Sequence, residues 1–422
     1  MISTEGLFVT RRYAGYQKPN LRIRFRQLSG LRSHLPLQKR HAQARAVVTS
    51  ARSSMDSVTR KVWRGSQAGD LEYLNMVEET LSPPGPREVR VKVKAVGLNF
   101  ADVFTVLGLY KAADTKDFVP GLEFSGVIDA HGEEVDEFRV GERIMGFTRF
   151  GAYSTYLNVD AGFVRPLPGA WSYDEGAAAL VQAITVFYAM RSLANVQAGE
   201  SVLIHSVAGG CGLRALAICE KLGVDAVGTV STPSKAEFVL KEFPKLKSEQ
   251  VIVRPTLGSW GEAATFSKQL QVAREAIGGS VQEEGFHMVL DSLLGNLYAP
   301  GWEHTRRGGR YIIFGAGSMT PTGGLSGISS VLSWCRLAWQ WLWRPRLDLL
   351  EMPGLNKAVF GFNLIWMTDK LETMSPLVDE MLKLELPAPH VGHRFPFEDC
   401  RSAMKTFQSG KTRGKVVLVI DE

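Results

Sequence analysis

The sequence predicts an α/β protein in which a β-rich module precedes a doubly wound parallel sheet. The first observation is the segment 202–230, where an apolar run, a glycine cluster, an apolar helix and a second apolar run follow one another. This order of strand, turn, helix and strand within about 30 residues is that of a βαβ unit. The second observation is the segment 88–96, whose two-residue alternation of apolar and polar side chains is typical of a strand.

The glycine cluster, Ser206-x-x-Gly209-x-x-Gly212, predicts a dinucleotide site. Glycines at a strand–helix junction let the backbone approach a pyrophosphate, and the helix N-terminus offers free N–H groups. The fingerprint G-x-G-x-x-G is incomplete, because Val207 stands at its first glycine. A plain glycine turn without a ligand therefore stays the alternative.

The end of the second strand favours NADPH over NADH. A site for NADH has an acidic residue about 20 residues after the glycines, which binds the ribose 2′-hydroxyl. Here the strand ends at Val230 and is followed by Ser231, Thr232 and Lys235, with no carboxylate. Hydroxyl groups and a lysine suit a 2′-phosphate. A solvated surface lysine is the alternative reading of Lys235.

The N-terminal segment, residues 1–55, predicts an organelle transit peptide. It carries eleven arginines and lysines and a single acid, Glu5, which is the composition of such leaders. We expect a chloroplast location, with the mitochondrion and a plain basic tail as alternatives. The rest of the chain is slightly acidic, which argues against nucleic-acid binding.

Weaker patterns complete the outline of the fold. They predict strands at 123–128, 152–157, 250–253, 288–291 and 311–314, helices at 376–386 and 397–407, and a last strand at 414–419. We expect this last strand to return to the β-rich module. The four cysteines form no C-x-x-C pair, which argues against a structural zinc or a disulfide framework.

A tryptophan-rich segment, residues 331–346, follows a Gly/Ser-rich connector at 320–330. Four tryptophans fall within ten residues, and the run is too short and too polar to span a bilayer. One reading is a helix that makes peripheral contact with a membrane, with tryptophans at the headgroup level. The other is a buried helix that caps the substrate cleft or a subunit interface.

Several motifs, in this order, resemble the medium-chain dehydrogenase/reductase superfamily, in its zinc-independent quinone oxidoreductase branch. They are Gly97–Asp102, Gly108–Tyr110, Pro120–Glu123, Ala208–Gly212, Val289–Ser292 and Gly414–Val416. Within this branch, the tryptophan-rich insert and residues 356–364 look most like the vesicle amine transport protein-like members.

The resemblance covers roughly residues 60–420 and implies two domains and a homodimer. A GroES-like catalytic domain would comprise residues 56–180 and 366–422. A Rossmann NADPH-binding domain would comprise residues 181–365, with the tryptophan-rich insert at 320–350.

The resemblance also predicts that no metal is bound. Zinc-using relatives hold their catalytic ion with Cys, His and Cys, and the matching positions here are Asn99, Leu122 and Val181. Zinc prefers thiolate and imidazole ligands, whereas these residues offer one amide. This argues against a metal-dependent alcohol dehydrogenase, which we keep as an alternative.

Without a metal, the expected reaction is hydride delivery from NADPH to a quinone or an α,β-unsaturated carbonyl. The resemblance places Tyr110 and Asn99 beside the nicotinamide and the substrate. Tyr110 would donate a hydrogen bond or a proton, and Asn99 would orient the carbonyl. A packed pocket wall is the alternative for Tyr110. A peripheral membrane protein that binds NADPH but has little catalysis is the alternative function.

The resemblance also implies which residues bind the cofactor. Those for the pyrophosphate are Gly209, Gly210, Cys211 and Gly212, and those for the 2′-phosphate are Ser231, Lys235 and Arg254. Those on the nicotinamide side are Thr185, Gly315, Ala316, Gly317 and Phe362, and Lys415 would touch the cofactor from the other domain. Arg254 stands where relatives often have a tyrosine, and arginine binds phosphate well.

Overall fold

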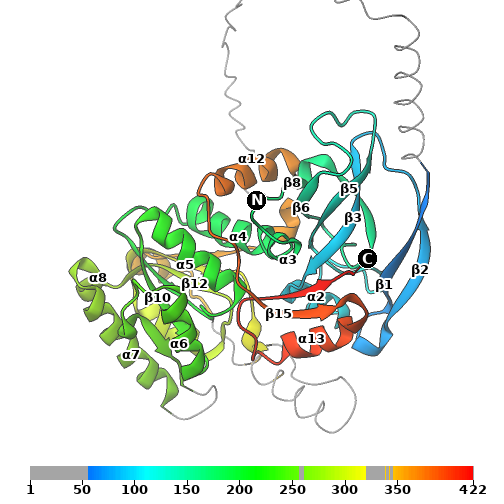
Figure 1. Cartoon of the computed structure of the whole chain (residues 1–422). Coiled ribbons are helices and arrows are strands. Elements are labelled where there is room, and N and C mark those ends of the chain that lie inside the picture. Colours follow the sequence, from blue (N-terminus) through cyan, green and yellow to red (C-terminus); the bar gives the residue numbers. More distant parts are fainter. Residues whose placement is uncertain (1–55, 256–260, 320–337, 339–341, 343–345, 422) are drawn as a thin grey trace, which may run out of the picture. The chain divides into compact units, whose positions relative to one another are not determined.

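The computed structural model describes residues 56–255, 261–319, 338, 342 and 346–421 (Figure 1). The chain clusters into two units, Met1–Ala51 and Arg52–Glu422, and all of the described residues belong to the second. The predicted transit peptide, residues 1–55, lies outside the described residues. So does nearly all of the tryptophan-rich segment 331–346.

The β-rich part is built on a seven-stranded sheet in the order β15-β16-β3-β5-β6-β8, with β7 paired to β3. The predicted strand at 88–96 is confirmed as β3, and Val89, Val91 and Val93 of this strand are buried. The strands are β3 (Glu88–Gly97), β5 (Glu123–His131), β6 (Arg143–Phe147), β7 (Tyr156–Asp160), β8 (Val164–Pro166), β15 (Val391–Pro396) and β16 (Lys415–Val419). A second sheet comprises β1 (Val58–Gln67), β2 (Leu74–Leu81) and β4 (Lys116–Phe118).

The end of the chain returns to this sheet, as predicted. Strand β16 pairs antiparallel with β3, with Val417 opposite Gly97, and parallel with β15. Trp63 on β1 donates its indole N–H to the carbonyl of Phe397 at 2.8 Å. The first and last described segments of the chain therefore share one core. The helices of this part are α2 (Phe100–Val106), α3 (Tyr173–Gly176), α12 (Leu371–Leu382) and α13 (Cys400–Gln408).

The second part is a six-stranded parallel sheet in the order β11-β10-β9-β12-β13-β14. Its strands are β9 (Ser201–Ile204), β10 (Asp225–Val230), β11 (Val251–Val253), β12 (Phe286–Asp291), β13 (Thr305–Ile313) and β14 (Ala358–Gly361). This is the doubly wound order, in which the chain changes direction between β9 and β12. Ligands of such sheets bind outside the carboxyl ends of the strands at this switch point.

Helices cover both faces of the parallel sheet. They are α4 (Leu180–Phe187), α5 (Gly210–Leu222), α6 (Pro233–Glu242), α7 (Glu262–Ile277), α8 (Gly279–Glu284) and α9 (Tyr298–Glu303). A further short helix, α11 (Met352–Leu355), precedes β14 and has no buried residue. Val202 and Ile204 of β9 pack in one apolar cluster with Leu216 of α5. Leu203, between them, packs in another with Phe266 of α7. The central strand is therefore buried on both faces, as expected for a parallel sheet.

Short helical turns connect these elements. The 3₁₀ turns are Leu71–Tyr73, Ala161–Phe163, Ser248–Gln250, Gly295–Leu297, Gly317–Met319, Leu364–Met367 and Phe397–Asp399. A π-helical turn, Tyr188–Leu193, continues α4.

Several predicted boundaries are wrong, among them the start of the strand predicted at 311–314, which is observed as β13, Thr305–Ile313. Helix α12 begins at Leu371 and runs through Pro376, although proline favours the first turn of a helix. Met374, Val378 and Met381 of this helix are buried in the core, and this packing outweighs the hydrogen bond that the proline lacks. The strand predicted at 152–157 is observed as β7, Tyr156–Asp160.

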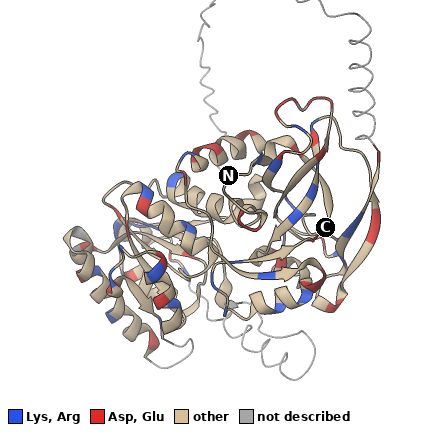
Figure 2. Ribbon diagram, in the orientation of Figure 1, with Lys and Arg blue, Asp and Glu red and all other residues tan. Residues whose placement is uncertain are grey.

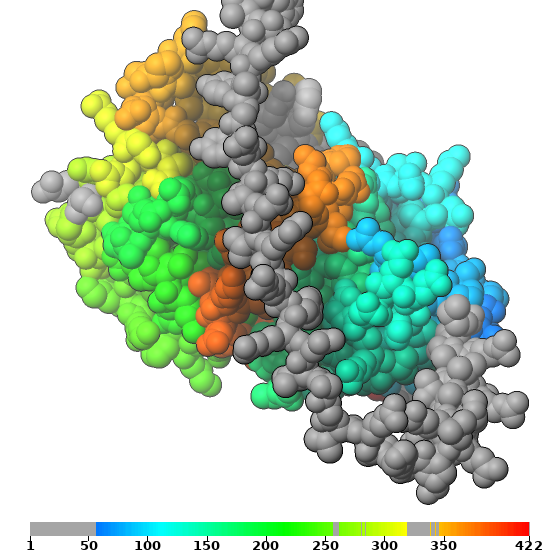
Figure 3. All heavy atoms as spheres, turned by 90° about the horizontal axis from the view of Figure 1, so that it is seen from above, coloured from blue at the N-terminus to red at the C-terminus, as the bar shows by residue number. Residues whose placement is uncertain are grey.

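Helix α12 connects the two parts along the chain and packs on both. Arg165 of β8 donates from Nε to Asp379 of α12 at 2.8 Å, and Met374 lies in the core cluster with α5. In Figure 3 the orange surface of α12 lies beside the blue-green surface of the β-rich part. Figure 2 shows both signs of charge interspersed over the two parts.

One helical run of the described chain, Tyr173–Leu193, is long and apolar enough to cross a membrane. In this fold 67% of its most apolar window is buried inside the protein. Its apolar character is therefore accounted for by core packing of α3 and α4.

Close contact between α5 and the preceding turn predicts that Gly212→Ala destabilises the protein. A Cβ atom at position 212 would lie 2.4 Å from Cα of Val207, which is backbone and cannot swing away. We expect a loss of about 1–3 kcal/mol in the free energy of unfolding, measured in urea. Gly169→Ala is the control, because no atom lies within 4 Å of its Cβ position. Equal stability of the two variants would contradict this packing.

Candidate cofactor and substrate site

The turn after β9 is shaped for the close approach of a ligand. Ser206 has a positive φ of 57°, and Gly209 caps the N-terminus of α5. A Cβ at Gly212 would strike Val207, and one at Gly210 would strike Gln182, so these two glycines serve packing. A Cβ at Gly209 would meet only the carbonyl of Ser206, at 3.3 Å. The turn is therefore open at Gly209, where the free N–H groups of α5 begin.

The last strand of the β-rich part closes on this turn. Gly414 donates its backbone N–H to the carbonyl of Ala208 at 2.9 Å, and Gly209 and Gly414 form an isolated parallel bridge. Residues predicted from two distant motifs thus meet at one place. Cys211 lies in the same turn, and burial raises the pKa of its thiol to about 12, so it stays protonated.

Lys415, next along this strand, is buried in a network of charges. Its ammonium donates to Oδ1 of Asn99 at 2.9 Å and to Oε1 of Glu123. Asn99 also donates from Nδ2 to Oε1 of Glu123 at 2.9 Å, and the backbone N–H of Val181 donates to Oε2 at 3.1 Å. Lys415 and Glu123 are at most 1% exposed, so each requires the other as its partner.

The three positions that match zinc ligands in relatives gather around Glu123. Asn99 and Val181 contact its carboxylate directly, and Leu122 precedes it in the chain. This set does not fit zinc, because it supplies one amide and an ammonium beside it. In the described part of the chain, no three His, Cys, Asp or Glu side chains come together as a metal site. Zinc independence stays a prediction.

Asp102 has a structural role at the start of α2. Its Oδ2 accepts hydrogen bonds from the backbone of Asn99 at 2.8 Å and from the hydroxyl of Tyr153 at 3.2 Å, which fixes the start of α2. Its Oδ1 has no partner among the described residues. Burial raises the pKa of this carboxyl to about 7, against the effect of these hydrogen bonds and of Lys415.

Tyr110 lies where the two parts of the chain meet. Its hydroxyl donates to Oδ1 of Asn363, which follows β14, at 2.9 Å. Burial raises the pKa of Tyr110 to about 12, so the phenol keeps its proton at neutral pH. The sequence prediction missed Asn363 as a site residue, although it lies in the segment 356–364 that carried part of the resemblance.

An aromatic wall, comprising Tyr188, Phe314 and Phe362, adjoins this contact. The ring centroid of Phe362 lies 5.2 Å from that of Tyr188 and 6.1 Å from that of Phe314. Thr185 lies one helical turn before Tyr188 and donates to the carbonyl of Val181 at 2.6 Å. The wall therefore forms from the ends of β13, β14 and α4.

Other residues predicted for the nicotinamide side follow β13. A Cβ at Gly315 would lie 2.8 Å from the carbonyl of Ser292, and one at Gly317 would lie 3.2 Å from it. Ala316 stands between these two glycines. The carboxyl ends of β12 and β13 therefore approach closely, with small residues where they meet.

The residues predicted for the 2′-phosphate gather at the ends of β10 and β11. Ser231 follows β10 and is exposed, and Arg254 follows β11 and bonds through its backbone to the carbonyl of Val230 at 3.0 Å. Burial and the charges of Arg254 and Arg413 lower the pKa of Lys235 to about 8. The Nη1 atom of Arg254 is buried without a hydrogen-bond partner among the described residues. This cationic cluster suits an anion.

Sequence comparisons identify the family. Residues 85–169 match the alcohol dehydrogenase GroES-like domain, and residues 263–418 match the zinc-binding dehydrogenase family. The synaptic vesicle membrane protein VAT-1 homolog of Homo sapiens is 30% identical over 340 residues, which are 80% of this chain and 80% of the relative. This chain belongs to the medium-chain dehydrogenase/reductase superfamily.

Solved structures similar to this medium-chain dehydrogenase/reductase have the same fold. The human VAT-1 homolog-like protein gives a TM-score of 0.66 at 22% identity, over 86% of this chain and 98% of that chain. The Escherichia coli quinone oxidoreductase, determined with NADPH, gives 0.66 at 24% identity, over 86% and 100%. The predicted combination of a GroES-like domain and a Rossmann sheet is confirmed.

The buried charge network predicts that Lys415→Met is strongly destabilising. The variant leaves the carboxylate of Glu123 buried without its cation, which costs about 3–5 kcal/mol. Urea unfolding measures the loss. The double variant Lys415→Met/Glu123→Gln should recover part of it, because no unpaired charge remains.

The control for this variant is Arg149→Gln, which breaks the exposed pair of Arg149 with Asp369. Exposed pairs contribute about 0–1 kcal/mol. If Lys415→Met cost no more than this control, the network would not have the role assigned to it.

The buried carboxyl of Asp102 predicts a stability that declines with rising pH. Its pKa of about 7 in the folded protein exceeds the value of about 4 in the unfolded chain, so the folded state holds this proton more tightly. The stability from the protonated form is complete below about pH 4 and is lost as the pH rises through about 7. Unfolding free energies across this range should fall less for Asp102→Asn than for the wild type. Parallel pH profiles would show that Asp102 does not titrate in this way.

Proposed function

We propose that this protein is an NADPH-dependent reductase of quinones or other conjugated carbonyl compounds. The observation that carries this proposal is the placement of two kinds of group near the switch point of the parallel sheet. An open glycine turn and a cluster of cations, Lys235 and Arg254, lie after β9, β10 and β11. A neutral phenol and an aromatic wall lie after β13 and β14.

The described residues fit NADPH. The pyrophosphate would lie at Gly209, where the backbone is open, and the 2′-phosphate would lie at Ser231, Lys235 and Arg254. Arg254 supports this most directly, because its Nη1 is buried without a partner among the residues that the structure describes, and such a nitrogen is costly unless a ligand satisfies it. The presence of NADPH in the E. coli quinone oxidoreductase, which has the same fold, agrees with this assignment.

Bound NADPH supplies a hydride, and the residues of this chain position and polarise the acceptor. Tyr110 keeps its proton at neutral pH. When an acceptor binds, its single O–H turns from Asn363 to the acceptor oxygen, on which negative charge develops. Asn363 orients the phenol. Tyr188, Phe314 and Phe362 offer ring faces and edges that favour a flat, conjugated acceptor. A hydride and a proton together convert a quinone to a hydroquinone.

The absence of suitable zinc ligands narrows the acceptor class. A quinone or an enone is already electrophilic, so a neutral hydrogen-bond donor is enough to direct hydride addition. Alcohol oxidation by a metal-dependent route needs an ion to stabilise the alkoxide, and Asn99, Leu122 and Val181 offer no suitable ligand set. Purified protein should therefore oxidise NADPH in the presence of a simple quinone, and a chelator should not change the rate.

Peripheral membrane association is a second candidate function. Leu347, Leu349 and Leu350, which follow the tryptophan-rich segment, are 40%, 78% and 91% exposed. Exposed apolar residues beside such a segment suit the surface of a bilayer. Flotation with liposomes tests this, and the variant Leu349→Ser/Leu350→Ser should float less than the wild type. Equal flotation would count against membrane contact through these leucines.

The chloroplast location and the homodimer remain proposals. A fusion of residues 1–55 to a fluorescent protein should enter plastids, and entry into mitochondria would favour the alternative. Size-exclusion chromatography with light scattering tests the dimer.

The role proposed for the phenol predicts that Tyr110→Phe lowers kcat for quinone reduction. Loss of a positioned proton donor costs about 10²-fold or more in rate. The KM for NADPH should not change, because Tyr110 lies away from the phosphate-binding residues. Steady-state NADPH oxidation measures both constants. Tyr73→Phe, at an exposed tyrosine in the β-rich part, is the control. An unchanged kcat in Tyr110→Phe would remove this residue from the mechanism.

A further inference from the structure

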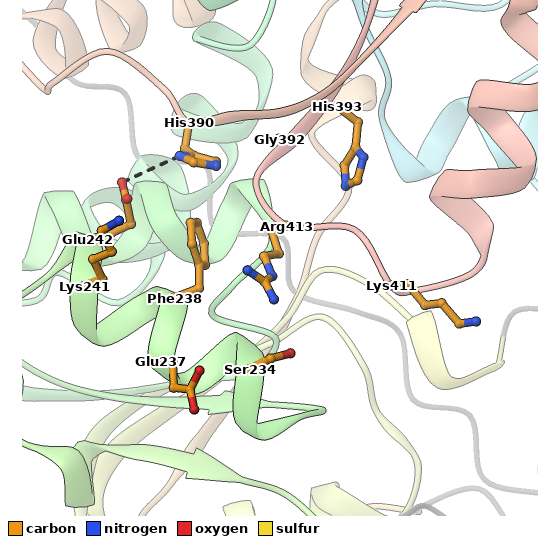
Figure 4. Close-up of a pocket in the computed structure, with 10 residues that line it drawn as sticks. All are labelled: Ser234, Glu237, Phe238, Lys241, Glu242, His390, Gly392, His393, Lys411 and Arg413. Carbon is orange, nitrogen blue, oxygen red and sulfur yellow. Dashed lines mark ion pairs between the residues drawn. The ribbon is translucent and has the colours of Figure 1, made fainter.

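A pocket of about 600 Å³ lies between α6 and the loop that precedes β16 (Figure 4). Ser234 and Phe238 line it from α6, and His393, Lys411 and Arg413 line it from the C-terminal segment. The pocket therefore takes walls from both parts of the chain. In Figure 4, Arg413 extends toward the first turn of α6, where Ser234 lies, whereas Lys411 points away.

The backbone holds Arg413 in place from both sides. Thr412 before it is buried, and Gly414 after it bonds to Ala208 and pairs with Gly209 of the cofactor turn. The guanidinium carbon of Arg413 lies 5.6 Å from the ring centroid of Phe238. Arg413 is therefore attached one residue from the proposed pyrophosphate turn and directed to the helix that carries Lys235.

Three cations converge here without a matching negative charge. Lys235 donates from Nζ to the carbonyl of Gly410 at 2.6 Å and makes no ion pair with an acid of the described residues. Arg413 makes neither a hydrogen bond nor an ion pair with any described side chain, and Nη1 of Arg254 has no hydrogen-bond partner within the part of the chain that the structure describes. The positive charges of Arg254 and Arg413 both lower the pKa of Lys235, so each of these arginines is close enough to repel the lysine.

The acids nearby do not remove this excess of charge. Glu237 and Glu242 line the same pocket, but neither makes an ion pair with Lys235, Arg254 or Arg413. Glu242 lies 3.6 Å from Nδ1 of His390. The carboxylate of Glu262 raises the pKa of Arg254 and so offsets part of its charge, but it has no such effect on the pKa of Lys235. The convergence of Lys235, Arg254 and Arg413 is the arrangement expected around a phosphate dianion.

We infer that Arg413 is the third cation of the 2′-phosphate site, so that the GroES-like part of the chain takes part in selecting NADPH over NADH. This inference rests on the proposed function. A phosphate at this place carries a charge of about −1.5 to −2 and offsets the repulsion among the three side chains. NADH has a hydroxyl there and leaves the three cations facing one another.

Calorimetric titration of the full-length protein tests the inference. The ligands are NADPH, NADH, adenosine 2′,5′-bisphosphate and 5′-AMP, so that each pair differs only in the 2′-phosphate. The variants are Arg413→Gln, the conservative Arg413→Lys and Arg254→Gln. Lys411→Gln is the matched control, because it removes an exposed charge from the same loop, and the side chain of Lys411, although at the pocket's edge, points away from α6 (Figure 4). Thermal unfolding shows whether each variant is folded.

Arg413→Gln should raise the Kd of NADPH and of the bisphosphate by about tenfold, which is the effect of losing one charged hydrogen bond. The Kd values of NADH and 5′-AMP should not change. Arg413→Lys should retain part of the affinity, and Lys411→Gln should retain nearly all of it.

Two results would overturn the inference alone. One is an equal loss of NADPH and NADH binding in Arg413→Gln. The other is a loss of NADPH binding in Arg254→Gln but not in Arg413→Gln, and then the proposed function would still stand. A wild-type protein that binds NADH as tightly as NADPH would overturn both the inference and the cofactor of the proposed function.

Discussion

A buried ion pair between Lys415 and Glu123 holds the centre of this protein together. Taking two charges out of water costs several kcal/mol for each ion, so the pair is stable only with its other hydrogen bonds in place. Asn99 and the backbone of Val181 provide these bonds, which ties the starts of α2 and α4 to β5 and β16. The residue before Lys415 pairs with the glycine turn. The register of one terminal strand thus sets the position of the catalytic part against the cofactor turn.

The same network explains how a member of this superfamily is organised without a suitable set of zinc ligands. The positions that correspond to metal ligands lie around Glu123, and the positive charge beside it belongs to Lys415. This ammonium is fully engaged and buried, so it is not free to polarise a substrate. In the proposed reaction, polarisation is left to a neutral donor, Tyr110, which suits acceptors that are electrophilic before they bind.

The cations near the cofactor turn are of two kinds, the buried Lys415 and the half-buried Lys235, Arg254 and Arg413. Lys415 is satisfied within the protein by a carboxylate and an amide. Lys235, Arg254 and Arg413 have no such partner and repel one another. The first arrangement stabilises the fold whether or not a ligand is present. The second lowers the stability of the free protein and favours the binding of an anion. We therefore assign Lys415 a structural role and the other three cations a role in ligand binding.

The sequence by itself determined the features that depend on neighbouring residues. The alternation at 88–96 predicted β3, the segment 202–230 predicted the βαβ unit, and the missing carboxylate after Val230 predicted the cofactor, because period, turn chemistry and local residue type are all legible within about 30 residues. Only the tertiary structure decided which distant side chains meet. Tyr110 and Asn363 are 253 positions apart, and Glu123 and Lys415 are 292 apart. Such pairs depend on strand order and register, which no local pattern specifies.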